Sequence, residues 1–303
     1  MLGHPVIEAL VVALLLGMLV RVFWRPGAAF EPGIRFAGKD VLELSVAILG
    51  ISVDLPLLVR AGPALGLAIV SIVAVGLGVG VMIARALGLP RRLAILVATG
   101  NAICGNSAIA AVAPVIGADA EDVASSIAFT AILGVIVVLG LPLLIGPLRL
   151  THYQYGVLAG LSVYAVPQVL AAAFPVSALS GEVATLVKLV RVLMLGPVVL
   201  FFSLRERNRA VRRPSLSTLV PWFIVGFLVL ATLRAVGVVP ESWVSPTRLV
   251  STNLTVLAMA ALGLSADVRA VARAGSRVVG AVSLSLIVLV ALGVALINAL
   301  HIQ

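Results

Sequence analysis

Charged residues are scarce in this chain. They make up 11% of its 303 residues, against about 25% in a typical soluble domain, while 62% of the residues are hydrophobic. So little charge cannot cover the surface of a compact water-soluble domain of this size, which excludes a soluble enzyme. The net charge is +9, but the bases stand in short breaks between apolar runs rather than in a patch with exposed aromatics. Nucleic acid is therefore not an expected partner.

Cysteine and histidine are scarce as well. Cys104 is the one cysteine, so no disulfide can form within the chain. The three histidines, His4, His152 and His301, fall at span ends or in loops, without metal-ligand spacing and without a hydrolase constellation. We therefore expect no metal, no cofactor and no enzymatic activity.

Apolar runs fill most of the chain. About 20 apolar helical residues cross a bilayer core of about 30 Å, and ten runs of about that length are separated by charge, proline or glycine. Their approximate limits are 5–23, 40–59, 62–87, 93–117, 122–147, 156–177, 183–203, 218–238, 249–267 and 278–300. The sequence predicts an all-α polytopic membrane protein with about ten transmembrane helices. We expect the protein to form a single transmembrane transporter domain, 1–303, with approximate halves 1–150 and 151–303.

The basic residues predict the orientation of these spans. Sixteen of the 21 Lys and Arg lie in or beside the loops after spans 1, 3, 5, 7 and 9, three lie on the other side, and two lie within span 7. The sixteen are Arg21, Arg25, Arg35, Lys39, Arg85, Arg91, Arg92, Arg149, Arg205, Arg207, Arg209, Arg212, Arg213, Arg269, Arg273 and Arg277; the three are Arg60, Arg234 and Arg248. Since basic flanks stay on the cytoplasmic side, both termini are predicted to be periplasmic in a bacterial inner membrane.

An internal repeat joins two pairs of spans. A shift of 213 residues lays 49–54 on 262–267 and continues without a gap to 60–62 on 273–275, matching a Ser, an Asp and an Arg. By the loop count the two copies run in opposite directions, which is the architecture of secondary transporters. The copies lie seven spans apart rather than five, and a permuted repeat and a convergent helix-turn-helix pattern are both open.

Span 4 carries polar residues at the depth of the bilayer centre. It contains Gly100, Asn101, Gly105, Asn106 and Ser107, and a glycine-rich polar stretch is costly in a lipid-facing helix. A helix broken near Gly105 would aim the backbone amides of Asn106 and Ser107 at an anion in the bilayer centre. The alternative is a small-residue packing seam in which the asparagines form hydrogen bonds between helices. We favour the broken helix.

Two further spans contribute candidate site residues. Span 6 contains Pro167 and Gln168, which indicate either a second interruption or a plain proline kink. Span 7 contains Lys188 and Arg191 three residues apart, hence on one face. Intramembrane bases usually face the protein interior. Lys188 alternatively snorkels to the interface, whereas Arg191 lies too deep to do so and is favoured as an anion ligand.

Four stretches resemble a known family. The run 103–116 reads ICGNSAIAAVAPVI, and it resembles the signature of the bacterial family of proposed sulfate exporters, within the bile/arsenite/riboflavin transporter superfamily. The stretches 167–172, 187–197 and 259–264 are similar to that family in the same order. The resemblance implies a polytopic secondary carrier with broken helices. The chain departs from the family at Asn106, where a small residue is common, and at Tyr164 and Ala165, where a His-acid pair is common.

These observations predict a secondary active transporter of a small anion such as sulfate, sulfite or a sulfonate. The substrate would bind at Gly105, Asn106, Ser107, Gln168, Lys188 and Arg191, and one helix bundle would move against the other. One alternative is a proton- or sodium-coupled carrier of an organic acid or neutral solute, which is favoured if Lys188 and Arg191 snorkel. The other is a membrane subunit or enzyme without transport activity.

Overall fold

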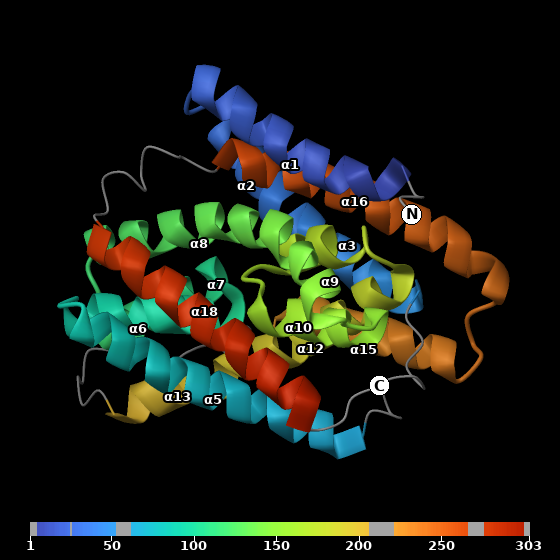
Figure 1. Cartoon of the computed structure of the whole chain (residues 1–303). Coiled ribbons are helices and arrows are strands. Elements are labelled where there is room, and N and C mark those ends of the chain that lie inside the picture. Colours follow the sequence, from blue (N-terminus) through green and yellow to red (C-terminus); the bar gives the residue numbers. More distant parts are fainter. Residues whose placement is uncertain (1–4, 25, 53–61, 206–220, 266–275, 300–303) are drawn as a thin grey trace. The chain divides into compact units, whose positions relative to one another are not determined.

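The computed structural model describes residues 5–24, 26–52, 62–205, 221–265 and 276–299 (Figure 1). Throughout these residues the regular elements are helical, and each of the ten predicted spans contains helix, which confirms an all-α membrane protein. The chain divides into two compact units. Unit 1 comprises Met1–Pro63 and Pro221–Asp267, and unit 2 comprises Ala64–Val220 and Val268–Gln303. Each unit draws on both of the halves 1–150 and 151–303.

Four helices within the described residues are long and apolar enough to cross a membrane. They are Leu65–Ala86, Ala178–Arg205, Glu241–Ser265 and Ser276–Ala299. Shorter apolar helices are Ala9–Phe23, Asn106–Ile116, Leu133–Leu148 and Trp222–Ala235. Several predicted spans are therefore built from helical segments that are individually too short to cross a bilayer core of about 30 Å.

Unit 1 is a bundle of helices from both ends of the chain. Its elements are α1 (Pro5–Phe23), α2 (Glu31–Phe36), the π-helix η1 (Ala37–Val41), α3 (Leu42–Leu49), the 3-10 turn η2 (Gly50–Ser52), α15 (Trp222–Ala235), the 3-10 turn η5 (Glu241–Trp243) and α16 (Val244–Ser265). Glycines allow close helix contacts: a Cβ at Gly17 of α1 would collide with the Ala260 carbonyl of α16, and one at Gly50 would collide with the Phe227 carbonyl of α15.

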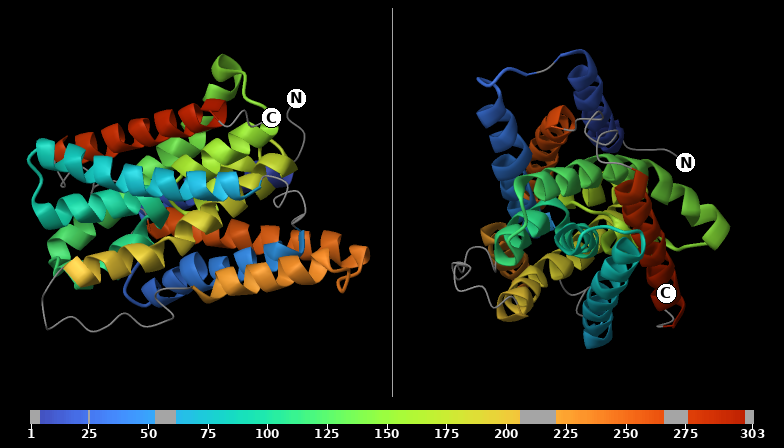
Figure 2. Two further views of the ribbon diagram at one scale, coloured as in Figure 1. Left: turned by 90° about the horizontal axis from the view of Figure 1, so that it is seen from below. Right: turned by 90° about the vertical axis from the view of Figure 1, so that its left-hand side faces the viewer.

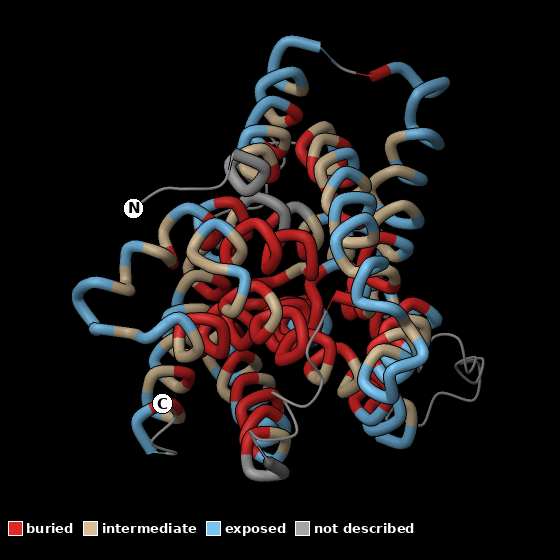
Figure 3. The backbone as a smooth tube through the Cα atoms, turned by 90° about the vertical axis from the view of Figure 1, so that its right-hand side faces the viewer, coloured by how far each residue is buried: buried red, intermediate tan, exposed pale blue. Residues whose placement is uncertain are grey.

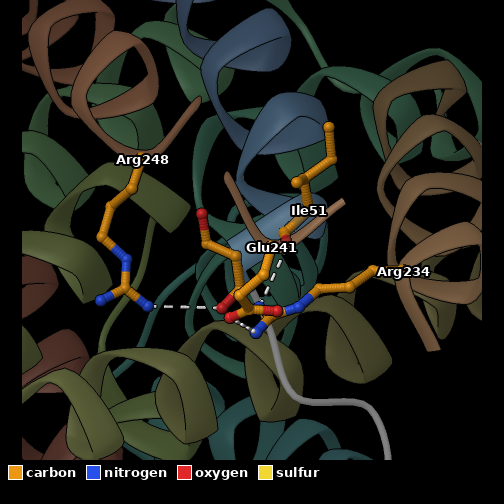
Figure 4. A network of polar contacts seen from close by, with 5 residues as sticks. Ile51, Arg234, Glu241 and Arg248 are labelled. Carbon is orange, nitrogen blue, oxygen red and sulfur yellow. Dashed lines mark hydrogen bonds and ion pairs between the residues drawn. The ribbon is translucent and has the colours of Figure 1, made fainter. Parts of the chain in front are cut away.

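Two arginines hold the carbonyl end of α3 and η2 (Figure 4). Arg234 of α15 donates to the Ile51 carbonyl at 3.0 Å, and Arg248 of α16 donates to the Ser52 carbonyl at 3.3 Å. Arg234 also lies 3.5 Å from the Glu241 carboxylate. The last carbonyls of a helix have no partner within it, so these arginines supply the missing donors. Two of the three bases predicted on the outer side thus have a structural role.

Unit 2 contains the segments with the predicted polar interior. Its elements are α5 (Gly62–Ala86), α6 (Arg91–Thr99), the π-helix η3 (Gly100–Cys104), α7 (Asn106–Ile116), α8 (Ala120–Gly140), the 3-10 turn η4 (Leu141–Leu144), α9 (Ile145–Leu148), α10 (His152–Ser162), α11 (Val166–Ala173), α12 (Ala178–Leu193), α13 (Leu195–Arg205) and α18 (Ser276–Ala299). In α10, α11 and α12 most residues are buried. Figure 3 shows the buried residues of the chain in red.

Span 4 is not a helix that continues across the membrane. Gly105 ends the π-helix η3 with φ +65°, and α7 then runs back beside α6. Near the turn, a Cβ at Gly100 would lie 3.0 Å from Ile109. At the open end, where α6 begins and α7 ends, a Cβ at Gly117 would lie 3.8 Å from the Arg92 guanidinium. The predicted break at Gly105 is confirmed, but the prediction that residues 93–117 cross as one span is wrong. Residues 91–116 form a helical hairpin.

Span 6 folds back in the same way. α10 ends at Ser162, the backbone of Val163 is extended, and α11 begins at Val166. The Tyr155 hydroxyl of α10 donates to the Ala172 carbonyl of α11 at 2.8 Å, so the two helices lie antiparallel. The interruption is confirmed over the simple proline kink, and the prediction of one crossing over 156–177 is wrong. At 1.5 Å per residue, the 11 residues of α10 span about 16 Å, half of a bilayer core.

The two hairpins point toward each other from opposite ends of α8. α8 begins three residues after Gly117, at the open end of the first hairpin. Halfway along, Thr130 lies against the turn of that hairpin, and one helical turn later Gly134 lies against Gln168 at the turn of the second hairpin. α9 and the open end of the second hairpin follow the far end of α8. The two turns therefore meet beside the middle of α8. We call these two turns the hairpin tips.

The helices that carry the internal repeat pack in antiparallel pairs. In unit 1, α3 lies along α16, with Ser251 Oγ 2.8 Å from the Ser45 carbonyl and Arg248 near Ser52. In unit 2, α5 contacts α18, since a Cβ at Gly76 would lie 3.1 Å from Leu289 and one at Gly280 would lie 3.8 Å from Leu87. The matched pairs Asp54 and Asp267, and Arg60 and Arg273, lie outside the described residues. The inverted repeat stays a prediction.

Candidate functional site

The hairpin tips contact each other inside unit 2. A Cβ at Gly105, the turn of the first hairpin, would lie 3.7 Å from the Tyr164 Cβ in the turn of the second and 3.6 Å from the Thr130 Cβ of α8. The φ of +65° at Gly105 is one that side chains rarely adopt, so glycine permits the turn. Tyr164 is fully buried, and its hydroxyl is one of the buried polar atoms without a hydrogen-bond partner.

Each hairpin exposes backbone carbonyls where its first arm ends. In the first hairpin the first arm is α6 with η3, and in the second hairpin the first arm is α10. Carbonyls at a helix C-terminus have no partner within the helix, and together they carry roughly half a negative charge. In the interior of a membrane protein no bulk water is present to bind them, so another part of the chain must supply donors.

Lys188 and Arg191 of α12 supply those donors to both hairpins. Lys188 Nζ donates to the carbonyls of Ile103 at 2.6 Å and Val163 at 2.9 Å. Arg191 donates through Nε to Ala102 at 3.1 Å, through one terminal nitrogen to Gly160 at 2.8 Å and Val163 at 3.3 Å, and through the other to Asn101 at 2.7 Å.

Both basic side chains are fully buried. The structure therefore does not show Lys188 snorkelling to a membrane interface; instead, the pair fastens the first arms of the two hairpins to each other. These six hydrogen bonds occupy four of the five guanidinium N–H groups and two of the three ammonium N–H groups. One N–H group on each side chain thus makes no hydrogen bond to the described residues.

The second arms of the hairpins present helix N-termini at the tips. α7 begins at Asn106 without a side-chain cap from Gly105, and α11 begins at Val166. Asn106 and Ser107 are exposed, and the Asn106 side-chain carbonyl accepts a hydrogen bond from the Thr130 hydroxyl. Uncapped amides at a helix N-terminus attract an anion.

Gln168 has a different position from that of Asn106 and Ser107. It is buried, its Oε1 accepts a hydrogen bond from the Ala165 amide at 3.2 Å, and its side chain lies directly on Gly134 of α8. Gln168 thus caps the start of α11. Thr130 and Gly134 lie one turn apart on α8, so α8 contacts the start of both second arms.

The ionisable side chains buried at the hairpin tips are mainly basic. Lys188 and Arg191 are the two basic side chains of this region. The carbonyl ends of the two first arms together carry roughly one negative charge, and the amide ends of α7 and α11 together carry roughly one positive charge. Among the described residues, no Asp or Glu is buried, and no group of three His, Cys, Asp or Glu side chains could hold a metal ion. The side chains buried in this region are therefore basic or neutral within the described part of the chain.

The structure brings all six predicted site residues to the two hairpin tips. It adds two that the sequence analysis did not assign, Tyr164 and Thr130. A second internal match points to Tyr164: a shift of 61 residues lays 109–115 on 170–176, with two alanines, a proline and a valine identical. This shift pairs the two second arms, placing Ser107 on Gln168, and it puts Tyr164 opposite Ile103 at the tip. No sequence pattern points to Thr130.

Comparison with known proteins places the chain in a family. Residues 2–282 match the family described as Conserved hypothetical protein 698. The chain belongs to this family. No solved structure matches it.

Relatives of this chain are named UPF0324 membrane proteins. One from Bradyrhizobium diazoefficiens is 53% identical over 97% of this chain and 85% of its own length. One from Brucella suis is 54% identical over 98% of this chain and 89% of its own length. The UPF0324 membrane protein TauZ of Paracoccus denitrificans is 34% identical over 99% of this chain and 89% of its own length. These names agree that the chain is a membrane protein, and they state no solute.

Proposed function

We propose that this protein is a secondary active transporter of a small oxyanion of the sulfate, sulfite or sulfonate kind. The observation that carries the proposal is the meeting of two oppositely directed hairpins at buried Lys188 and Arg191. Uncapped amides and an exposed Asn106 and Ser107 stand at the same place. Interrupted helices whose N-termini face a site near the bilayer midplane are the usual binding site of secondary transporters.

The two hairpins differ in exposure, which suggests how access alternates. On α7, Asn106, Ser107, Ala110 and Pro114 form an exposed line from the tip toward the open end of the first hairpin, whereas α11 is buried along its whole length. In this state the substrate would reach the tips along α7. In the opposite state α11 would be uncovered and α7 buried. The Lys188–Arg191 pair, bound to both first arms, would keep the tips together during the exchange.

The hairpins also change the proposed membrane topology. A hairpin enters and leaves on one side, so spans 4 and 6 no longer count as crossings, and about eight crossings are left. Both termini remain periplasmic, and most of the basic residues remain on the cytoplasmic side of the inner membrane. Two loops change sides: the turn with Asp119, Glu121 and Asp122 becomes cytoplasmic, and the loop with Arg149 becomes periplasmic.

This topology is tested at Arg149. A reporter active only in the periplasm should be active when fused after Arg149 and after Gln303, and inactive when fused after Ala118. Ten simple crossings would give the reverse result at Arg149 and Ala118 and the same result at Gln303, so the Gln303 fusion is the internal control. An inactive Arg149 fusion would contradict the re-entrant hairpins in the membrane.

Substrate binding is tested with the purified protein. We expect sulfate, sulfite, thiosulfate or a short sulfonate such as methanesulfonate or taurine to raise its melting temperature and to be transported in proteoliposomes. Asn106→Ala should weaken binding by about tenfold at a nearly normal melting temperature, because Asn106 is exposed and contributes little to packing. Ser126→Ala on α8 is the control, and it should leave binding unchanged. The Ser126 hydroxyl donates to the Asp122 carbonyl one turn away. No response to any of these anions would sink the proposal.

A further inference from the structure

Two arginines meet where α5 turns into α6, at an end of unit 2 far from the hairpin tips. Arg85, in the last turn of α5, donates to the Leu89 carbonyl at 2.7 Å, so its guanidinium lies over the turn. Arg277, in the first turn of α18, reaches the same turn: a Cβ at Gly88 would lie 3.7 Å from its terminal nitrogen. Gly88 has φ +82° and no side chain, so both arginines approach the backbone there.

The neighbouring Arg92 is occupied differently. It lies beside Gly117, at the turn that carries Asp119, Glu121 and Asp122, so carboxylates offset its charge. Within the residues that the structure describes, neither Arg85 nor Arg277 lies in an ion pair with a carboxylate. The positive charge at the α5–α6 turn is therefore not offset by an acidic side chain of the described chain.

The helix surface next to these arginines is apolar and exposed. Only 33% of the most apolar stretch of α5, and the same share of α18, is buried inside the protein, and both helices lie at the periphery of unit 2 (Figure 2). Met82, one turn before Arg85, is 70% exposed, and Leu284, two turns after Arg277, is 45% exposed. In a membrane protein such a surface contacts lipid acyl chains.

We infer that Arg85 and Arg277 bind the head group of an anionic phospholipid, whose acyl chains lie along α5 and α18. The phosphate would lie between the two guanidinium groups over Gly88, because arginine forms strong hydrogen bonds with phosphate oxygens. Basic pockets between helices at the cytoplasmic end of a membrane protein commonly bind anionic lipids. The inference rests on the proposed topology, in which the basic residues of this loop predict a cytoplasmic position.

The test measures lipid selection by native mass spectrometry. The purified protein is exchanged into an equimolar mixture of phosphatidylglycerol and phosphatidylcholine with matched acyl chains. We expect the wild type to retain phosphatidylglycerol preferentially. In the double variant Arg85→Gln/Arg277→Gln this preference should fall about fivefold for each arginine removed. That factor corresponds to the usual attraction of one basic side chain to an anionic lipid surface. Arg149→Gln, an exposed arginine elsewhere in unit 2, should leave the preference unchanged.

Three results would overturn the inference. They are equal phosphatidylglycerol retention by the wild type and the double variant, equal loss in the Arg149→Gln control, and displacement of the lipid by millimolar glycerol phosphate. The last would show a phosphate site that does not need acyl chains. If the double variant does not fold, Arg277→Gln alone decides the matter, since Arg277 makes no hydrogen bond to the described part of the chain.

Discussion

Arg191→Gln is expected to unfasten the two hairpins and to abolish transport. The substitution removes up to four hydrogen bonds and leaves buried carbonyls of Asn101, Ala102, Gly160 and Val163 short of donors. Each such bond contributes about 1 kcal/mol in a membrane interior, so we expect a loss of roughly 2–4 kcal/mol of stability. Thermal unfolding of the purified variant measures this loss, and proteoliposome uptake measures transport.

Two variants separate the arginine's structural contribution from its charge. Arg234→Gln removes an arginine that also binds a helix-end carbonyl, but in unit 1, so it should lower the melting temperature without changing anion affinity. Arg191→Lys keeps the charge and loses the planar fork, so it should retain part of the anion affinity while losing much of the stability. If Arg191→Gln unfolds like the wild type and binds anions normally, the fastening of the hairpins has no functional role.

Gly105→Ala is expected to reduce transport by at least about tenfold. Its φ of +65° and ψ of −124° cost an alanine about 1–3 kcal/mol, which the turn would relieve by shifting. Because Gly105 lies against Tyr164 and Thr130, that shift would move the start of α7 and its anion-binding amides. Uptake by proteoliposomes, normalised to the amount of folded protein, measures the effect.

Gly237→Ala is the matched control. Gly237 also has a positive φ, +79°, but a Cβ there meets nothing within 4 Å, and the residue lies in unit 1. Gly237→Ala should also strain the backbone, but only Gly105→Ala should impair transport. Equal transport by both variants would show that the turn at Gly105 tolerates a side chain, as an ordinary helix would.

The sequence by itself determined the class of the protein and the chemistry of its interior. Ten apolar runs with little charge leave no alternative to helices in a membrane, because only a helix satisfies its own backbone there. The positions of Gly105, Gln168, Lys188 and Arg191 within those runs were informative for the same reason: a polar group inside a membrane must have a partner. The break at Gly105 followed from glycine and asparagine at mid-span.

Only the tertiary structure decided where the chain goes after each break. Local sequence marks Gly105 and Val163 as interruptions, but a broken helix that continues and one that folds back have the same hydropathy and similar length. The return depends on distant contacts, such as Tyr155 with Ala172. It depends also on Arg191, which binds carbonyls about 30 and 90 residues away along the chain. Hydropathy counts apolar residues along the chain, whereas these hydrogen bonds depend on which helix ends meet, and no local pattern specifies that.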